Sequence, residues 1–270
     1  MNSTPSAQEA HDAVRRVGDH LALEALARIG FVVSGIVHVV IGYTAGRLAW
    51  GGGGGQADQS GALASLASNP GGVVLMWVIV IGLLALVLWE LTLVVAPTVG
   101  DRGTKDRVTA GGKAVMYAAL AYTALQFAIG SGSSSSSEES SQDFTSTLMQ
   151  QPAGRWLVGA VGVGVLVVGG YHVYKGVSRG FLDSLEEDPG RAATVLGIIG
   201  YPAKGIVLAL VGVFFLVAAV QKQSEEASGL DGALKSLRDQ PFGPYLLTLV
   251  ALGLAAFGVY CFARARHQKM

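Results

Sequence analysis

The sequence has few charged residues for its length. Asp, Glu, Lys and Arg make up 14% of the 270 residues, whereas about a quarter of an average soluble domain is charged. Hydrophobic residues make up 51%, and the mean hydropathy is +0.47. This composition excludes an ordinary soluble domain and favours an integral membrane protein.

Cysteine is nearly absent, and the charges balance. The lone Cys261 excludes an intramolecular disulfide and a cysteine-rich metal site, and no two histidines have the spacing of a metal pair on one helix. The 19 basic and 19 acidic residues give no net charge, so nothing favours nucleic acid as a partner. We expect no metal, no cofactor and no nucleic acid, and the scarcity of convergent charges argues against an enzyme.

Long apolar runs are abundant instead. A helix crosses the hydrocarbon core of a bilayer in about 20 apolar residues. Six segments qualify: Ile29–Trp50, Gly72–Ala96, Gly111–Gly130, Trp156–Tyr174, Leu196–Val220 and Pro244–Ala263. Backbone groups must pair within the segment in lipid, which requires helices, and no ten-residue stretch alternates as a membrane strand does. The sequence predicts an all-α, polytopic membrane protein with six transmembrane helices.

Lys and Arg are distributed unevenly between the loops. Fourteen of the 19 lie in the N-terminal segment, in the second and fourth connectors and in the C-terminal tail. Because basic loops stay in the cytoplasm, both termini are predicted to be cytoplasmic. Residues 1–28 carry apolar side chains at helical spacing, which predicts an amphipathic cytoplasmic segment before the first span.

Four residues recur at fixed distances from three prolines. A leucine lies four residues before each proline, and glycines lie two and twelve residues after it, with an aromatic residue nineteen after it. The copies are Leu66, Pro70, Gly72, Gly82 and Trp89; Leu148, Pro152, Gly154, Gly164 and Tyr171; and Leu237, Pro241, Gly243, Gly253 and Tyr260. The chain therefore contains three tandem repeats of two helices each.

Repeats of two helices all enter the membrane from the same side. The hairpin repeats span residues 29–96, 111–175 and 196–264. Parallel repeats are related by an axis along the membrane normal, so we predict a single membrane domain with a pseudo-threefold arrangement. Gly82, Gly164 and Gly253 recur at one depth, where we expect them to let neighbouring helices approach closely.

The first helices of the repeats share a looser motif. Gly30-Phe31 with Ser34-Gly35-Ile36-Val37 matches Gly200-Tyr201 with Lys204-Gly205-Ile206-Val207, and Lys113-Ala114-Val115-Met116 is the middle copy. Together with the Pro-x-Gly sites, this pattern resembles a bacterial membrane family catalogued as domain of unknown function 1206, over roughly residues 27–266. Ser34 departs from the family pattern, which has a basic residue there, and the middle copy lacks the Gly-aromatic start. The resemblance implies tandem two-helix modules in a bacterial inner membrane and no particular activity.

A short apolar stripe precedes each proline on the predicted outer side. The stripes consist of Leu63 and Leu66, of Phe144 and Leu148, and of Leu230, Leu234 and Leu237. We predict three short helices that lie across the outer mouths of the hairpins.

Ionisable residues within the spans are informative because each is costly in lipid unless it is paired or hydrated. His38 lies nine residues after Ile29, and Glu90 lies six residues before Ala96, so the two differ in depth by only about 4 Å. We predict that His38 and Glu90 share a polar site in the cytoplasmic half of the membrane. Lys113, His172 and Lys204 are candidate supporting residues.

Three functions fit these features. The first is a structural or accessory component of the membrane, which contacts lipid and other membrane proteins through its helix faces. The second is a conduit for a small solute or ion along the pseudo-threefold axis, which needs polar residues repeated around that axis. The equivalent positions are polar in two copies of three: His38, Tyr117 and Leu208 at one level, and Glu90, His172 and Cys261 at another. The third is a haem or redox protein with His38 and His172 as axial ligands. The poverty of polar groups favours the first.

Overall fold

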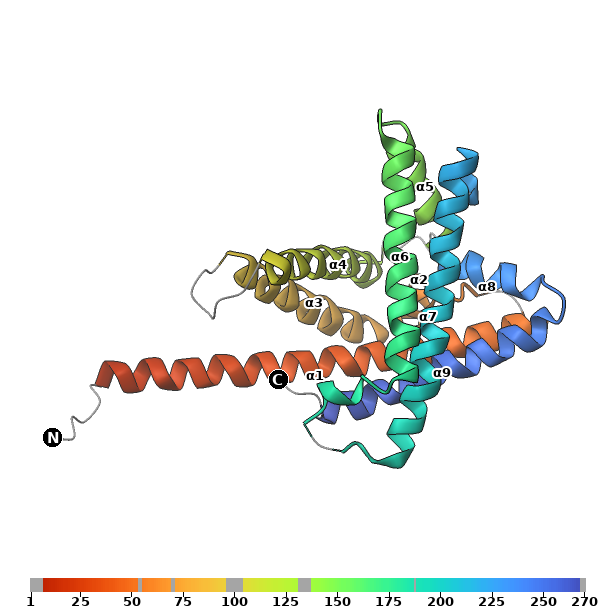
Figure 1. The fold of residues 1–270 in the computed structure, drawn as a ribbon. Coiled ribbons are helices and arrows are strands. Elements are labelled where there is room, and N and C mark those ends of the chain that lie inside the picture. The colour runs from red at the N-terminus through yellow and green to blue at the C-terminus, as the bar shows by residue number, and fades with distance from the viewer. Residues whose placement is uncertain are drawn as a thin grey trace.

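The protein is built from helices, as predicted, and its computed structural model describes residues 7–52, 55–68, 71–95, 104–130, 137–186 and 188–267. No strand occurs in those residues (Figure 1). The long helices are α1 (Ala7–Ala49), α3 (Gly72–Val95), α4 (Thr104–Ala128), α6 (Gly154–Val177), α7 (Gly190–Gln221) and α9 (Gly243–His267). The short helices are α2 (Gln59–Ala67), α5 (Ser137–Met149) and α8 (Leu230–Arg238), with single 3₁₀ turns at Leu182–Ser184 and Ser224–Glu226. The three predicted short helices are thus confirmed as α2, α5 and α8, and their place on the outer side stays a prediction.

Six long helices match the six predicted spans, but their apolar character differs. Arg28–Ala49 of α1, α6, α7 and α9 are each long and apolar enough to cross a membrane, and α3 contributes a shorter apolar stretch, Gly72–Leu88. Within its predicted span α4 carries Lys113, Tyr122 and Gln126, which lower its mean hydropathy. Length and composition of the described residues therefore show four candidate spans, and the six-span arrangement stays a prediction.

Helix α1 is one continuous helix of 43 residues. The predicted N-terminal segment therefore extends the first span instead of forming a separate helix, and its beginning projects beyond the other helices (Figure 1). Most side chains of its apolar stripe lie outside the described residues.

The long helices pair between repeats more closely than within them. The most extensive contacts join α6 to α7, α1 to α9 and α3 to α4. Each of these pairs combines the second helix of one repeat with the first helix of the next, and α9 returns to α1 at the start of the chain. Within repeats, α7 packs on α9, α1 touches α3 only at a few residues, and α4 and α6 do not pack closely in the described residues. In the described residues the two long helices of the second repeat are therefore not packed together and those of the first repeat touch only slightly, so the arrangement as three hairpins stays a prediction.

The three helix pairs do not run along one common axis. The α6–α7 pair crosses the α1–α9 pair, with α7 and α9 in contact at the crossing (Figure 1). The predicted bundle about a single membrane normal is not seen in this arrangement, and the pseudo-threefold symmetry stays a prediction.

Glycines at equivalent positions form close contacts between helices of different repeats. A Cβ atom on Gly35 of α1 would lie 2.8 Å from the carbonyl oxygen of Gly258 on α9. A Cβ atom on Gly205 of α7 would lie 2.5 Å from the carbonyl oxygen of Gly169 on α6. Gly35 and Gly205 occupy the same place in the first-helix motif, and Gly169 and Gly258 both lie seventeen residues after the repeat's proline. The same contact therefore recurs at two interfaces between repeats.

A second pair of equivalent contacts lies two helical turns further along the same two interfaces. A Cβ atom on Gly42 would meet the carbonyl oxygen of Ala251 at 2.7 Å, and one on Gly212 would meet that of Gly162 at 2.9 Å. Each glycine lies seven residues after the motif glycine, and each partner lies ten residues after the proline. In the α3–α4 pair the motif positions are alanines, Ala114 and Ala121, and both are buried. Small residues thus allow close approach at each of the three interfaces.

Two of the three glycines predicted to pack do not. Gly253 lies directly against the Cβ atom of Ala203 on α7, so a side chain there is excluded, as predicted. A Cβ atom added at Gly82 or Gly164 would meet nothing within 4 Å. The reason is where each glycine lies around its helix. The residues of α3 and α6 that face the neighbouring helix lie ten and seventeen residues after the proline, and the residue twelve after it lies on another face.

The glycine of each Pro-x-Gly site has a defined task. Gly72, Gly154 and Gly243 each begin the second helix of their repeat, and a Cβ atom on any of them would collide with the carbonyl groups that end the preceding short helix. The colliding carbonyls are those of Leu66, Leu148 and Arg238. The repeated glycine therefore lets the chain fold back tightly from the short helix into the long one.

Candidate functional site

Glu90 is a buried carboxylate at the α3–α4 interface. Its side chain is 8% exposed, and Oε1 lies 3.5 Å from Nζ of Lys113 on α4. The other oxygen, Oε2, is buried without a hydrogen-bond partner in the described residues. Because an unpaired buried carboxylate costs several kcal/mol, the contact with Lys113 stabilises Glu90 at this interface. Of the candidate supporting residues, Lys113 is therefore the partner of Glu90.

The other two interfaces between repeats have residues at the positions equivalent to Glu90 and Lys113. Glu90, His172 and Cys261 each lie twenty residues after a proline. His172 lies near enough to Lys204 for their charges to interact, and the Cys261 thiol lies against the Ser34 hydroxyl. Lys204 and Ser34 are the motif counterparts of Lys113. One residue position thus faces the first helix of the next repeat at all three interfaces, with different chemistry at each.

His38 belongs to a different cluster from Glu90. Its Nδ1–H donates to the carbonyl oxygen of Ser34 at 2.8 Å, and its ring meets the ring of Phe257 edge-on at 4.8 Å. No hydrogen bond, ion pair or ring contact joins His38 to Glu90 in the described part of the chain. The predicted shared site assumed that α1 and α3 pack along their length, whereas His38 faces α9 and Glu90 faces α4.

Aromatic side chains fill the space between α6, α7 and α9. Tyr201 stacks on Phe181 at 5.3 Å and meets Phe257 and Tyr260 edge-on at 5.1 and 5.5 Å. Its ring also lies 6.0 Å from that of His172. Two repeated positions hinted at this cluster: the aromatic residue at the start of the first-helix motif, Tyr201, and the aromatic residue nineteen after the proline, Tyr260.

The same rings occupy the place of a haem between the two histidines. A continuous row of packed rings runs from His38 through Phe257 and Tyr201 to His172. Both inner rings are 3% exposed. A haem held by both histidines would have to displace them, so this packing does not fit the predicted axial ligation.

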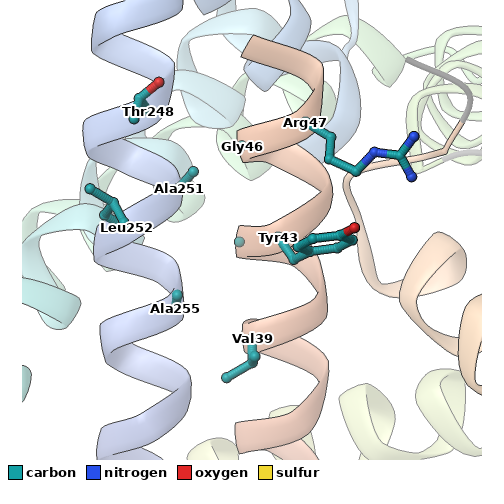
Figure 2. A pocket seen from close by; sticks show the side chains of 9 residues that line it. Val39, Tyr43, Gly46, Arg47, Thr248, Ala251, Leu252 and Ala255 are labelled. Carbon is teal, nitrogen blue, oxygen red and sulfur yellow. The ribbon is translucent and has the colours of Figure 1, made fainter. Parts of the chain in front are cut away.

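An open apolar groove runs between α1 and α9, with a volume of about 420 Å³. Its walls are Val39, Gly42, Tyr43, Gly46 and Arg47 on α1, and Thr248, Ala251, Leu252 and Ala255 on α9. The Arg47 side chain points away from α9 and out of the groove (Figure 2). Charge is therefore missing from the groove itself, which favours lipid chains over a polar ligand.

The short helix α8 connects the segments that join the two long helices in each of the three repeats. Asp231 of α8 is fully buried, and its Oδ1 accepts a hydrogen bond from the Ala57 N–H at 2.8 Å. Its Oδ2 lies 2.6 Å from Nζ of Lys235, which also reaches Glu138 of α5 at 3.6 Å. The hydrogen bond with Asp231 raises the pKa of Lys235 above its ordinary value. We call this set of side chains, Asp231, Lys235 and Glu138, the outer polar cluster; sequence patterns did not identify it, because its contacts join residues that are far apart in the chain.

Similarity to known proteins bears on the repeats and not on an activity. The family described as Domain of Unknown Function (DUF1206) matches residues 29–95, 108–179 and 199–268. The "Uncharacterized protein YxxB" of Bacillus subtilis (strain 168) is 30% identical over 257 residues, which is 92% of each chain. No solved structure matches. The three matched segments confirm the resemblance read from the motifs, and the chain belongs to the family Domain of Unknown Function (DUF1206).

Proposed function

We propose that this chain is an integral protein of the bacterial inner membrane with a structural or accessory role. Its six long helices belong to three repeats, of which the last packs on the first, and both termini lie in the cytoplasm. The observation that carries the proposal is the return of α9 to α1 through the same small-residue contact that joins α6 to α7. Because the last repeat packs on the first, each repeat contacts both of the others. The helix faces that point outward are then left for lipid and partner proteins.

Exposed apolar side chains support the membrane location. On α6, Leu157, Val163, Val167 and Tyr174 are each about half exposed or more. A soluble protein seldom exposes such a continuous apolar face, whereas lipid solvates it. At the predicted outer end of the α1–α9 pair, Trp50 donates to the Thr248 hydroxyl at 3.1 Å, which suits the aromatic belt of a membrane interface.

The polar groups support a structural role over a conduit. A conduit needs polar side chains around an open path. Glu90 is paired with Lys113, Cys261 lies against Ser34, and His172 packs on Tyr201. These side chains are held in interfaces between repeats.

Reconstitution separates the two roles. The full chain is incorporated into liposomes loaded with pH-sensitive and ion-sensitive dyes, and the leak of protons, K⁺ and Cl⁻ is compared with that of empty liposomes. We expect no increase for the wild type. A saturable flux that is lost in Glu90→Gln or His172→Ala would replace the structural role with a conduit.

A second arm tests the accessory role itself. In the native bacterium, deletion of the gene should shift the mobility of a defined membrane complex on a native gel, and expression of the full chain should restore it. Unchanged mobility of every membrane complex, together with a flux in liposomes, would contradict the proposal.

A further inference from the structure

The groove between α1 and α9 lies where two side chains are smaller than their equivalents in the other repeats. One position lies eleven residues after the motif glycine or alanine of the first helix, and the other lies fourteen residues after the proline. At the α1–α9 interface these residues are Gly46 and Ala255, and both line the groove. At the other two interfaces both positions are leucines: Leu216 and Leu166 between α7 and α6, and Leu125 and Leu84 between α4 and α3.

The first-helix leucines are packed into their interfaces. A Cβ atom on Gly162 would lie 3.0 Å from Cγ of Leu216, and Leu125 packs against buried residues of the α3–α4 pair. The equivalent of Gly162 on α9 is Ala251. A Cβ atom on Gly46 would lie 3.9 Å from the Cβ atom of Ala251, which is ordinary contact, so a side chain has room there. The groove is therefore a particular gap in the α1–α9 interface.

The dimensions and lining of the groove suit a lipid chain. Val39 and Arg47 are eight residues apart, so the groove follows α1 for about 12 Å. This length fits within one leaflet of the hydrocarbon core, roughly 15 Å. The Thr248 hydroxyl in its wall already donates to the Pro244 carbonyl oxygen at 2.6 Å and accepts from Trp50. Apolar walls with a satisfied hydroxyl favour an acyl chain over a polar ligand.

Arg47 supplies an exposed cation at one end of the groove. It lies in the last turn of α1, and its side chain points out of the groove (Figure 2). No carboxylate forms an ion pair with it in the residues that the structure describes. Nearby, Trp50 and Tyr245 meet edge-on at 5.5 Å and are 64% and 62% exposed. Such aromatic residues mark the depth of lipid headgroups, where a guanidinium can bind a phosphate through two hydrogen bonds.

We propose that this groove binds an anionic phospholipid from the leaflet on the side of α2 and α8. One acyl chain lies over Gly46 and Ala255, in the place that Leu216 and Leu166 take at the α6–α7 interface, and the phosphate lies at Arg47. A second copy of the chain fits this groove less well. A twofold axis through it would bring two Arg47 cations together, and none of the lining residues is a carboxylate. The lipid site rests on the membrane location proposed above.

The test of the acyl-chain site is the thermal unfolding of the full chain in a neutral detergent with added phosphatidylglycerol or phosphatidylcholine. Phosphatidylglycerol should raise the Tm of the wild type by several degrees more than phosphatidylcholine does. Gly46→Leu installs the leucine of the other interfaces, so it should raise the Tm without lipid and lose most of the response to both lipids. Ala255→Leu fills the groove from α9 and should lose the response as well. Gly164→Leu is the matched control and should keep it, because a Cβ atom there meets nothing within 4 Å.

Arg47→Gln tests the phosphate contact separately. It should keep the response to phosphatidylcholine and reduce the response to phosphatidylglycerol to the same level. Arg155→Gln is its control, because it removes an exposed cation that lies over the Trp156 ring at 4.8 Å, and it should keep the preference for phosphatidylglycerol.

Native mass spectrometry identifies the occupant directly. Bound phosphatidylglycerol should appear on the wild type and be about tenfold weaker on Gly46→Leu. A full lipid response in both groove-filling variants, or a preference for phosphatidylglycerol that survives Arg47→Gln, would overturn the site. A lipid-free dimer that Gly46→Leu converts to a monomer would overturn it too and assign the groove to a second copy. In each case the membrane location stands if the chain still fractionates with membranes, and it fails only if the chain does not.

Discussion

At the scale of single residues, the chain places unlike side chains at positions that its repeats make equivalent. Glu90, His172 and Cys261 lie twenty residues after their prolines and face the first helix of the next repeat. The same geometry yields an ion pair at Glu90, an imidazole near an ammonium at His172, and a thiol next to a hydroxyl at Cys261. The interface contact is therefore set by the repeat, and the chemistry is set by the individual residue.

The ion pair makes a prediction that separates two partners of Glu90. Glu90→Gln and Lys113→Gln should be non-additive, with an interaction energy on the order of 1 kcal/mol in a double-mutant cycle, because the two charges face each other at 3.5 Å. Glu90→Gln and His38→Gln should be additive, because the two side chains belong to separate clusters. Unfolding free energies in mixed micelles provide the measurement. Coupling of Glu90 with His38 and none with Lys113 would contradict this assignment.

Glycines at contact and non-contact positions make a second prediction. Gly258→Ala should cost about 1 to 3 kcal/mol by overpacking, since its Cβ atom would lie 2.7 Å from the carbonyl oxygen of Gly35. Gly164→Ala is the matched control and should cost nothing measurable, since its Cβ atom meets nothing within 4 Å. Equal losses in both variants, measured by thermal unfolding, would show that the contact face of the second helices has been placed wrongly.

At the scale of elements, the short helices hold together the ends of the repeats at which α2, α5 and α8 lie. Asp231 of α8 binds the backbone before α2, and Lys235 of α8 reaches Glu138 of α5. Asp231→Asn should destabilise the protein by about 1.5 to 3 kcal/mol, the range for hydrogen bonds to charged groups. Asp239→Asn is the control, because its pair with Arg238 is exposed and should be worth under about 0.5 kcal/mol. Chemical unfolding of both variants checks the difference, and equal values would remove the role assigned to Asp231.

The outer polar cluster also predicts a pH dependence. Folding raises the pKa of Lys235 above its ordinary value, so the folded state binds this proton more tightly than the unfolded state does. Its stabilising contribution is then complete below the unfolded pKa of about 10.4 and is lost as the pH rises through the higher folded pKa. The Tm difference between the wild type and Lys235→Met should be constant from neutral pH to about 10 and should shrink above it. A difference that grows in alkali would mean that the pKa is lowered instead. Because the Lys235 side chain is 44% exposed, we expect the effect to be small.

At the scale of the whole molecule, sequence patterns predicted the elements better than their partners. Helix positions, the three repeats and the short outer helices follow from apolar length and from recurring Leu, Pro and Gly residues, because these are local properties of the chain. The predicted pairing of His38 with Glu90 is not seen. It was based on the depth of each residue along its helix, and such a comparison holds only if the two helices are neighbours. Contact between the second helix of one repeat and the first helix of the next depends on the long-range packing of Gly35 on Gly258 and of Gly169 on Gly205.

Orientation is a further property of the whole molecule. In intact cells, a cysteine introduced at Ser65 of α2 should react with a membrane-impermeant maleimide, and one at Ser178 after α6 should react only after permeabilisation. Both positions are exposed, and the native Cys261 is buried, so background labelling should be low. Labelling of Ser178→Cys in intact cells would place the termini outside.

The closure of the three repeats through α1 and α9 is the central claim, and a single crosslink tests it most directly. Ser34→Cys places a second thiol against the native Cys261, and Val32→Cys on the exposed side of α1 is the control. A protease site is inserted between α4 and α5, so that cleavage leaves the two cysteines on different fragments.

After mild oxidation in membranes and proteolysis, the Ser34→Cys fragments should stay joined on a non-reducing gel and separate after reduction. The joined species should have the mass of one chain, and the Val32→Cys fragments should separate under both conditions. Separation of the Ser34→Cys fragments, or their joining only between two chains, would show that the first and last repeats of one chain do not meet.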